Sequence, residues 1–239
     1  MLGAWTFLHA TDALLGARFT ASLGMALARA GKRVLLFDLS PEIPALDAFL
    51  GVDGQVVYTL TDVTRIPPID AALSPHENLF FIPISTEDEV SASDIALCMD
   101  AFSADVVLFS ASRSTLPLAS ASSDGTLLLS DASPVAMRAS CALSSHAGFD
   151  GFVLTDFVPD RKELEGALGL TEILDAVELP LLGILPRVSP YSPRLPESKD
   201  FLTAVENMAG RISGEQIPLL RGIAVKEALK EYFFKRISE

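Results

Sequence analysis

The sequence contains few of the residues that build disulfide frameworks and metal sites. Among its 239 residues are two cysteines and three histidines. Cys98 and Cys141 lie far apart and outside any C-x-x-C pattern, which indicates two buried thiols in a reducing compartment. His76 and His146 stand in polar stretches typical of solvated loops. Because widely spaced histidines give no ligand pattern, we predict no metal site.

Basic residues and long apolar runs are also scarce. Lys and Arg number 18 against 31 Asp and Glu, for a formal net charge of −13. Nucleic-acid binding needs clustered basic residues, so we expect no nucleic-acid partner. No apolar run approaches the roughly 18 to 20 residues that cross a bilayer, and the N-terminus lacks the pattern of a signal peptide. We expect a cytoplasmic protein, at most peripheral at the inner membrane face.

Short apolar runs alternate with segments of helical spacing along the chain. Most runs are apolar throughout, which is typical of strands covered on both faces of a parallel sheet. One helix is expected to carry Phe19, Leu23 and Leu27 on a single face and to end near Gly31. The expected strands are residues 5–9, 33–38, 79–85, 105–110, 125–130, 151–156 and 181–185. The pattern predicts the α/β class: a doubly wound, mostly parallel sheet flanked by helices.

Ligands of such sheets bind at the carboxyl ends of the strands. The segments found there are residues 9–18, 38–44, 110–113, 130–134, 156 and 186–188. Residues 110–124 are rich in Ser, Ala and Thr and indicate a loop or weak helix. Residues 186–196 hold four prolines and indicate an irregular connection.

The stretch HATDALLGARFT at residues 9–20 stands where a phosphate-binding loop is expected. Such a loop needs glycines for close backbone approach, a lysine for the β- and γ-phosphates and a Ser or Thr hydroxyl for magnesium. The stretch contains a single glycine, Gly16, and no lysine. This composition argues against nucleotide chemistry.

Several segments resemble the MinD branch of the ParA/MinD P-loop ATPases. They are GKRVLLFD at 31–38, LD at 46–47, LG at 50–51, VVYTLTDV at 56–63, ENLFFIP at 77–83 and LPLLGILP at 179–186. The order and spacing match from the first strand to about residue 190. The resemblance implies a P-loop fold. Active members of that family bind ATP with magnesium, dimerise across the nucleotide, attach to membrane by a C-terminal amphipathic helix and position cell-division machinery.

The resemblance also implies where the nucleotide-binding residues should stand. By position, the family's signature lysine falls on Thr11 and a glycine on Asp12. The phosphate-binding lysine falls on Gly16 and the magnesium-binding Thr on Ala17. A register shifted by one residue puts Ala17 and Arg18 at the Lys and Thr positions, so neither register restores the loop.

Two acidic positions of the family are likewise changed. Asp38 is present, but Ser40 replaces the aspartate that helps position the attacking water, and Ser110 replaces the aspartate that helps hold hydrated magnesium. A serine supplies no charge for a hard cation. Losing one electrostatic element of a catalytic site commonly costs about 3 to 4 kcal/mol. We therefore expect no catalytic residues and no cofactor.

Alternative roles remain open for several of these residues. Asp38 is either a cap of the following loop, which we favour, or a remnant ligand. Arg18 is expected to pair with Asp38 or Asp12 rather than to replace the lysine. Asp12 would repel phosphate and cap the helix. A hydrolase site of Ser110 or Ser112 with His9 is disfavoured, because no G-x-S-x-G elbow surrounds either serine.

We expect residues 222–239 to form a tail after a domain of residues 1–221. Its apolar residues recur every fourth position, which indicates an amphipathic helix. The residues resembling a membrane-contacting or partner-contacting tail are Leu229, Phe233, Phe234, Lys235, Arg236 and Ile237. From residue 226 onward the sequence contains four Lys or Arg and three Glu. Because this charge is nearly balanced, attraction to anionic lipid would be weak. Packing on the domain is the alternative.

These features predict a MinD-like pseudo-ATPase that serves as a positioning or scaffold protein for a division, pilus or secretion assembly. Its partner would be another protein, with membrane contact as an additional mode. A homodimer would not be driven by nucleotide, since the signature lysine position is Thr11. The alternative is an atypical ATPase that binds ATP and magnesium through Arg18 and Asp38 and switches between monomer and dimer.

Overall fold

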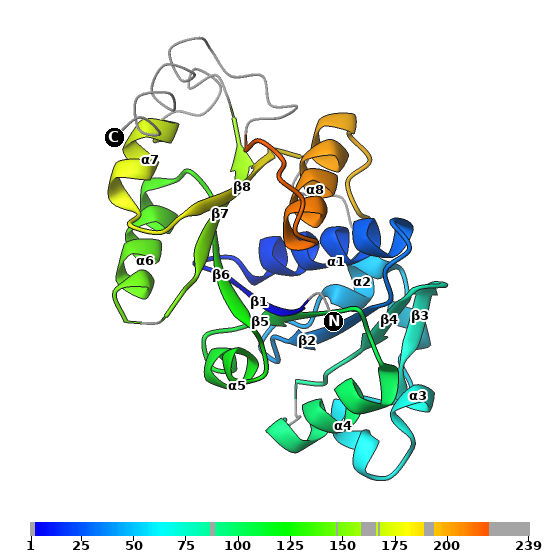
Figure 1. Cartoon of the computed structure of the whole chain (residues 1–239). Coiled ribbons are helices and arrows are strands. Elements are labelled where there is room, and N and C mark those ends of the chain that lie inside the picture. Colours follow the sequence, from blue (N-terminus) through cyan, green and yellow to red (C-terminus); the bar gives the residue numbers. More distant parts are fainter. Residues whose placement is uncertain are drawn as a thin grey trace.

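An eight-stranded sheet lies at the centre of the fold (Figure 1). The computed structural model describes residues 3–86, 89–146, 148–158, 166, 168–188 and 194–219. The strands are β1 (Gly3–His9), β2 (Val34–Leu39), β3 (Leu73–His76), β4 (Leu79–Ile82), β5 (Val106–Ala111), β6 (Gly125–Ser130), β7 (Gly151–Phe157) and β8 (Leu181–Pro186). Their order is β3-β4-β2-β5-β1-β6-β7-β8. Only β3 and β4 pair antiparallel, which confirms the predicted doubly wound, mostly parallel sheet.

Helices cover both faces of the sheet (Figure 1). They are α1 (Ala13–Arg29), α2 (Leu46–Leu50), α3 (Pro68–Ala71), α4 (Ala92–Phe102), α5 (Leu116–Ala121), α6 (Pro134–Ser144), α7 (Leu170–Ala176) and α8 (Lys199–Ile212), with short 3-10 turns at Asp53–Gln55 and Leu60–Thr64. The helices α1, α2 and α8 share one apolar core with the sheet. The other face is covered by α3, α4 and α5 towards β4 and by α6 and α7 towards β8.

The helix α1 lies against the middle of the sheet and positions the loop that precedes it. Phe19, Leu23 and Leu27 are fully buried, as the helical spacing predicts. Phe19 contacts Phe7 of β1 edge to face, with ring centroids 5.1 Å apart. The helix ends at Arg29, and Gly31 follows with a φ of 82°, a left-handed conformation that glycine adopts without strain.

The differences from the expected elements lie at their ends and at one edge. Residues 125–130 match β6 at both ends. Each of the other expected strands differs from the observed strand by one to three residues at one end or at both. The strand β3 was not predicted, and His76, expected in a solvated loop, lies at its end. Cys98 is buried as predicted, whereas Cys141 is only half-buried. The short helix α5 lies within residues 110–124, where a loop or weak helix was expected.

Candidate functional site

The predicted site residues gather at the carboxyl ends of three adjacent central strands. In the sheet register Asp38 of β2 lies beside Ser110 of β5, and Phe7 of β1 lies beside Ser110 on its other side. The chain that follows β1 carries Thr11, Asp12 and the start of α1. Arg113 joins the segments after β5 and β1, because its Nη2 donates to the Ala10 carbonyl at 2.8 Å. The sequence therefore placed these residues on the correct edge of the sheet.

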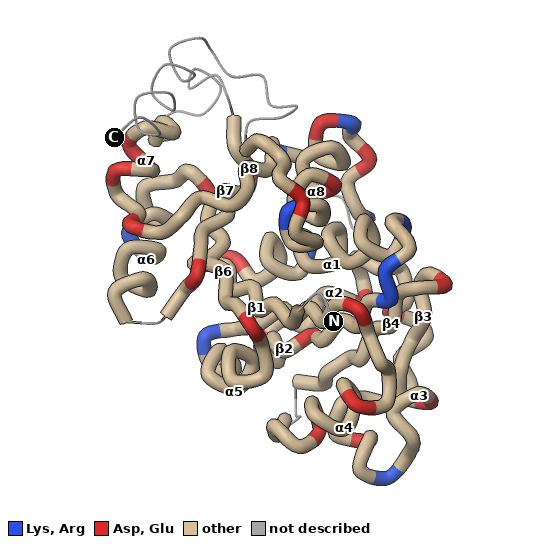
Figure 2. The backbone as a smooth tube through the Cα atoms, viewed as in Figure 1, with Lys and Arg blue, Asp and Glu red and all other residues tan. Residues whose placement is uncertain are grey.

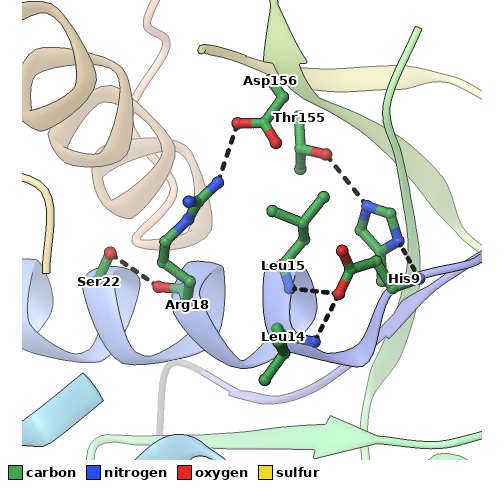
Figure 3. Close-up of polar contacts among 8 residues, drawn as sticks. His9, Leu14, Leu15, Arg18, Ser22, Thr155 and Asp156 are labelled. Carbon is green, nitrogen blue, oxygen red and sulfur yellow. Dashed lines mark hydrogen bonds and ion pairs between the residues drawn. The ribbon is translucent and has the colours of Figure 1, made fainter. Parts of the chain in front are cut away.

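His9 fixes the path of the loop between β1 and α1 (Figure 3). Its Nδ1 accepts hydrogen bonds from the backbone N–H of Asp12 at 3.0 Å and of Thr11 at 3.3 Å. Its Nε2 lies 3.2 Å from Thr155 Oγ1. A ring nitrogen that accepts N–H bonds carries no proton, so the neutral tautomer with hydrogen on Nε2 fits this geometry. Burial lowers the pKa of His9 to about 4, which keeps the ring neutral.

Asp12 caps the first turn of α1 with its own carboxylate. Its Oδ1 accepts from Leu14 N at 2.9 Å and from Leu15 N at 3.3 Å (Figure 3). These are the N–H groups that a helix N-terminus would otherwise offer to an anion. The capping role expected of Asp12 is confirmed, and the start of α1 already contains a negative charge from the chain itself.

Asp38 caps the loop and helix that follow β2. Its Oδ1 accepts from Ser40 N at 3.1 Å, and its Oδ2 accepts from Ala45 N at 2.9 Å and Leu46 N at 3.0 Å. The side chain is buried, and this burial raises its pKa to about 6 against the effect of the three N–H donors. The capping role that the sequence favours for Asp38 is confirmed.

Ser40 and Ser110 are buried beside Asp38. Ser40 Oγ lies 3.5 Å from the Ser110 carbonyl oxygen, to which it donates. Neither of these two positions carries a carboxylate, and the neighbouring Asp38 carboxylate accepts hydrogen bonds from the backbone. The pair therefore brings hydroxyl groups, not charge, to the ends of β2 and β5.

Arg18 forms a partly buried ion pair with Asp156 (Figure 3). Its Nη2 lies 2.9 Å from Asp156 Oδ1, and the two side chains are 7% and 19% exposed. The expected pairing with Asp38 or Asp12 was wrong, because both of those carboxylates bond backbone N–H groups. Burial raises the pKa of Asp156, and the neighbouring Arg18 opposes that rise. The pair ties α1 to the end of β7, where Asp156 has a positive φ of 49°.

The remaining predicted site residues differ in the room around them. Gly16 and Ala17 are buried, and Thr11 is exposed. A Cβ added at Gly16 would lie 3.3 Å from His9 Cβ, a tight contact in a packed interior. Gly16 is therefore suited to the close approach of α1 to the end of β1.

We compared these residues with the needs of ATP and magnesium. A phosphate needs free N–H groups and a cation, and magnesium needs oxygen ligands that are not already bonded. Here the N–H groups of Leu14 and Leu15 bond Asp12, Arg18 bonds Asp156, and Asp38 bonds three backbone N–H groups. The described residues do not fit ATP with magnesium in the manner that active P-loop ATPases bind it.

Three functional contacts of this site were missed by sequence reasoning. Thr155 and Asp156 lie more than 130 positions from the residues they bond, and Arg113 bonds a carbonyl about 100 positions away. The position of Asp156 at a strand end was the available signal. The pairing of Asp156 with Arg18 became visible only in the fold, because no local sequence pattern relates β7 to α1.

Other predictions concern metal ions, the membrane and the tail. Within the ranges that the structure describes, no group of three or more His, Cys, Asp or Glu side chains is placed to hold a metal ion. In the same ranges no helix has both the length and the apolarity to cross a bilayer. The predicted tail residues, from Leu229 to Ile237, lie outside the described residues.

Comparison with known proteins agrees with this fold. The family model of the CobQ/CobB/MinD/ParA nucleotide binding domain matches residues 18–200. The septum site-determining protein MinD of Synechocystis sp. is 26% identical over 244 residues, covering 91% of this chain and 92% of that protein. MinD of Thermotoga maritima is 35% identical over 83 residues, covering 32% of this chain and 31% of that protein.

Solved structures of other proteins have a similar fold over most of this chain. The MinC:MinD cell division protein complex of Aquifex aeolicus aligns with a TM-score of 0.78 and 21% identity, covering 90% of this chain and 98% of that one. The Pyrococcus furiosus cell division ATPase MinD aligns with a TM-score of 0.70 and 21% identity, covering 90% and 99%. These likenesses concern the fold. Together with the family model, which spans most of the sequence, they show that the chain belongs to the CobQ/CobB/MinD/ParA family as a MinD-like member with a P-loop NTPase fold.

Proposed function

We propose that this chain is a MinD-like pseudo-ATPase that acts as a positioning or scaffold protein without using nucleotide. The observation that carries the proposal is the closed loop between β1 and α1. His9 accepts hydrogen bonds from two N–H groups of the loop, and Asp12 accepts hydrogen bonds from two N–H groups in the first turn of α1. An incoming phosphate would meet a carboxylate at the place where it needs donors, and no lysine stands in the stretch from 9 to 20 to offset that charge.

The process it serves is proposed from its relatives. The curated relatives are septum site-determining proteins, and one structural neighbour is a complex of MinD with MinC. We propose a role of the same kind, in positioning a division-site, pilus or secretion assembly, through contact with a protein partner. A fold that keeps its sheet and helix layers while its loop is closed retains the surfaces that protein contacts need.

The alternative is an ATPase that binds ATP through Arg18 and Asp38 and switches between monomer and dimer. Both side chains are committed in this structure, Arg18 to Asp156 and Asp38 to the backbone. Freeing either one would leave a buried charge without its partner, which is costly. The alternative therefore has less support than the nucleotide-independent function.

Titration calorimetry with ATP and magnesium tests the proposal. We expect no saturable heat at micromolar or low-millimolar ATP for the natural chain. The variant Asp12→Asn keeps a capping oxygen and removes the charge, so any gain in ATP binding by this variant identifies the Asp12 carboxylate as a barrier. Saturable micromolar binding by the natural chain would overturn the pseudo-ATPase proposal.

Membrane contact through residues 222–239 is a separate part of the proposal and rests on the sequence pattern of the tail. Co-sedimentation with anionic liposomes would compare the full chain with a chain that ends at residue 221. Equal pelleting of the two would remove the membrane contact and leave the nucleotide-independent function in place. A dimer, where one forms, is proposed to have a basis other than nucleotide.

A further inference from the structure

The two edge strands of the sheet differ in how they are protected from pairing with further strands. The strand β3 has four residues and contains Ser74, Pro75 and His76. Short edges with proline and polar residues disfavour added strands. The strand β8 at the opposite edge has six residues, none of them polar. Among the residues that the structure describes, only β7 pairs with it. The free edge of β8 therefore needs a cover from elsewhere in the chain.

Arg211 near the end of α8 holds the first part of such a cover. Its Nη1 donates to the carbonyl oxygen of Leu182 in β8 at 3.2 Å. Its Nε and Nη2 donate to the carbonyl oxygens of Ile217 and Pro218, at 3.0 Å and 2.7 Å. Figure 1 shows these orange-red residues returning from α8 to β8. One guanidinium group thus ties the chain that follows α8 to the edge strand.

The chain crosses the edge of β8 between Ile217 and Leu219. Ile217 lies against α8, because a Cβ added to Gly210 would meet its Cδ1 atom. Leu219 instead packs on the apolar core that α6 and α7 share with the sheet. These two helices cover the face of the sheet opposite to α8. Leu219 therefore directs the following residues towards α7 and β8.

Partly exposed leucines border the core that Leu219 joins. They lie on α7, on either side of it, or at the start of β8, and each is only partly buried. An amphipathic helix laid over them would bury its own apolar side chains together with theirs. We call this surface the α7–β8 border. Its leucines are Leu168, Leu174, Leu179 and Leu181.

The tail has the pattern and the length for this border. Its apolar residues recur every fourth position from Val225 to Ile237, so they form one stripe of a helix. A helix over residues 222–237 is about 24 Å long, close to the roughly 20 Å of a six-residue strand such as β8. From Leu219 to residue 222 is about 10 Å of extended chain. The start of the tail therefore cannot lie far from the α7–β8 border.

The charge of the border agrees with the residues beside the stripe. Between residues 169 and 186 the sequence contains three acidic residues and no Lys or Arg, and Figure 2 shows the acidic positions of α7 in red. On a helix Lys226 and Lys230 stand next to the apolar stripe. Glu227 and Glu231 stand farther round the helix, on the side that would face solvent. The acidic residues of the border are Glu172, Asp175 and Glu178.

We propose that residues 222–239 dock as an amphipathic helix on the α7–β8 border of the same chain. The position of Leu219, the apolar edge strand and the partly exposed leucines together select this occupant. A stripe buried on the domain is not available to lipid, so the docking opposes the membrane contact proposed for the same residues. The inference rests neither on that contact nor on the absence of ATP binding.

Hydrogen exchange of the full chain, read by mass spectrometry, tests the docking. The variant Phe233→Glu puts a charge into the apolar stripe. Phe234→Glu makes the same change one position later, about 100° farther round the helix and away from the centre of the stripe. We expect the amides of α7 and β8 to exchange about ten-fold faster in Phe233→Glu than in the natural chain, because their cover is lost. In Phe234→Glu they should exchange at the natural rate.

The opposite edge of the sheet is the internal control. The amides of β3 and β4 should exchange alike in all three proteins, which separates loss of the cover from loss of global stability. Unchanged exchange of α7 and β8 in Phe233→Glu, or equal acceleration in both variants, would overturn the docking. Natural exchange rates in a chain that ends at residue 221 would overturn it as well.

Dilution separates the chain's own tail from that of a second copy. Protection of α7 and β8 by the chain's own tail does not depend on protein concentration, and we expect the same exchange rates over a hundred-fold dilution, which is about the span that such measurements allow. Protection that is lost on dilution would assign the α7–β8 border to a second copy and reject intramolecular docking. Neither result depends on whether the chain binds ATP or pellets with liposomes.

Discussion

At the scale of single residues, His9 holds the loop through the lone pair of one ring nitrogen. Nδ1 accepts N–H bonds from Thr11 and Asp12, and protonation would replace that lone pair with a donor facing two donors. The carboxylate that most favours a charged ring is that of Asp12, which is already bonded to the start of α1. We therefore expect protonation of His9 to destabilise the loop.

This predicts a loss of stability in mild acid. The pKa of His9 is about 4 in the folded chain against an ordinary value of 6.5, so the unfolded chain binds a proton first as the pH falls. The contribution of neutral His9 to the free energy of unfolding is complete above pH 6.5 and is lost as the pH falls towards 4, by an amount on the order of 3 kcal/mol. Urea denaturation at several pH values between 7.5 and 4.5 measures this slope.

The matched variant is His9→Asn, whose side-chain oxygen replaces the Nδ1 acceptor and does not titrate. We expect a shallower fall in the free energy of unfolding between pH 6.5 and 4.5 for this variant. Asp38 contributes an opposite slope in both proteins, because burial raises its pKa to about 6 and the folded chain then binds a proton first. The difference between the two proteins isolates His9. The same slope in both would contradict the assignment.

At the scale of elements, α1 packs unusually close to the sheet at Gly24. A Cβ added there would lie 2.9 Å from Leu36 Cδ2 and 3.3 Å from Leu79 Cδ1. Leu36 and Leu79 are fully buried and have little room to move. Since α1 carries Asp12 and Arg18 at its first turns, this close contact also fixes where the capped loop and the ion pair lie.

We predict that Gly24→Ala lowers stability although alanine is the better helix former. The propensity gain is about 1 kcal/mol, and the overpacking cost is about 1 to 3 kcal/mol, so a net loss of about 1 kcal/mol is expected in urea denaturation. In a Leu36→Ala background the space is free and the same substitution should cost less or stabilise, which a double-mutant cycle detects. A Gly24→Ala chain more stable than the natural one would refute the close-contact argument.

The elements that sequence reasoning found and missed differ in their exposure to solvent. The strand β6 (Gly125–Ser130) is buried throughout, and the turn-forming Gly125 and the polar Ser130 on either side of its three leucines marked both of its ends. The edge strand β3 contains Ser74 and Pro75, which read as a turn, and it pairs on only one side. Asp12 and Asp38 were correctly interpreted as caps because a cap is a local feature. The pairing of Arg18 with Asp156 joins residues 138 positions apart, and no local pattern carries that information.

At the scale of the whole molecule, the site is closed by several contacts that act together. His9 and Asp12 hold the loop, Arg18 bonds Asp156, and Asp38 bonds the start of α2. Effects of groups that act as a unit do not add. Restoring one member of an ATP site is therefore expected to restore little, because the others still compete for the same donors and space.

Gly16→Lys puts the family's lysine at its expected position and tests this. We predict no micromolar ATP binding by calorimetry and no ATP-dependent phosphate release, because the new ammonium group lies near the Asp12 carboxylate and the N–H groups of α1 remain capped. The new Cβ lies 3.3 Å from His9 Cβ, a tight contact whose cost of about 1 kcal/mol is comparable to the gain of about 1 kcal/mol in helix propensity, so we expect little net change in the free energy of unfolding. Gly16→Ala adds the same Cβ without the charge, and its free energy of unfolding in urea should likewise change little. Micromolar ATP binding by Gly16→Lys alone would mean that the missing lysine, rather than the closed loop as a whole, keeps nucleotide out.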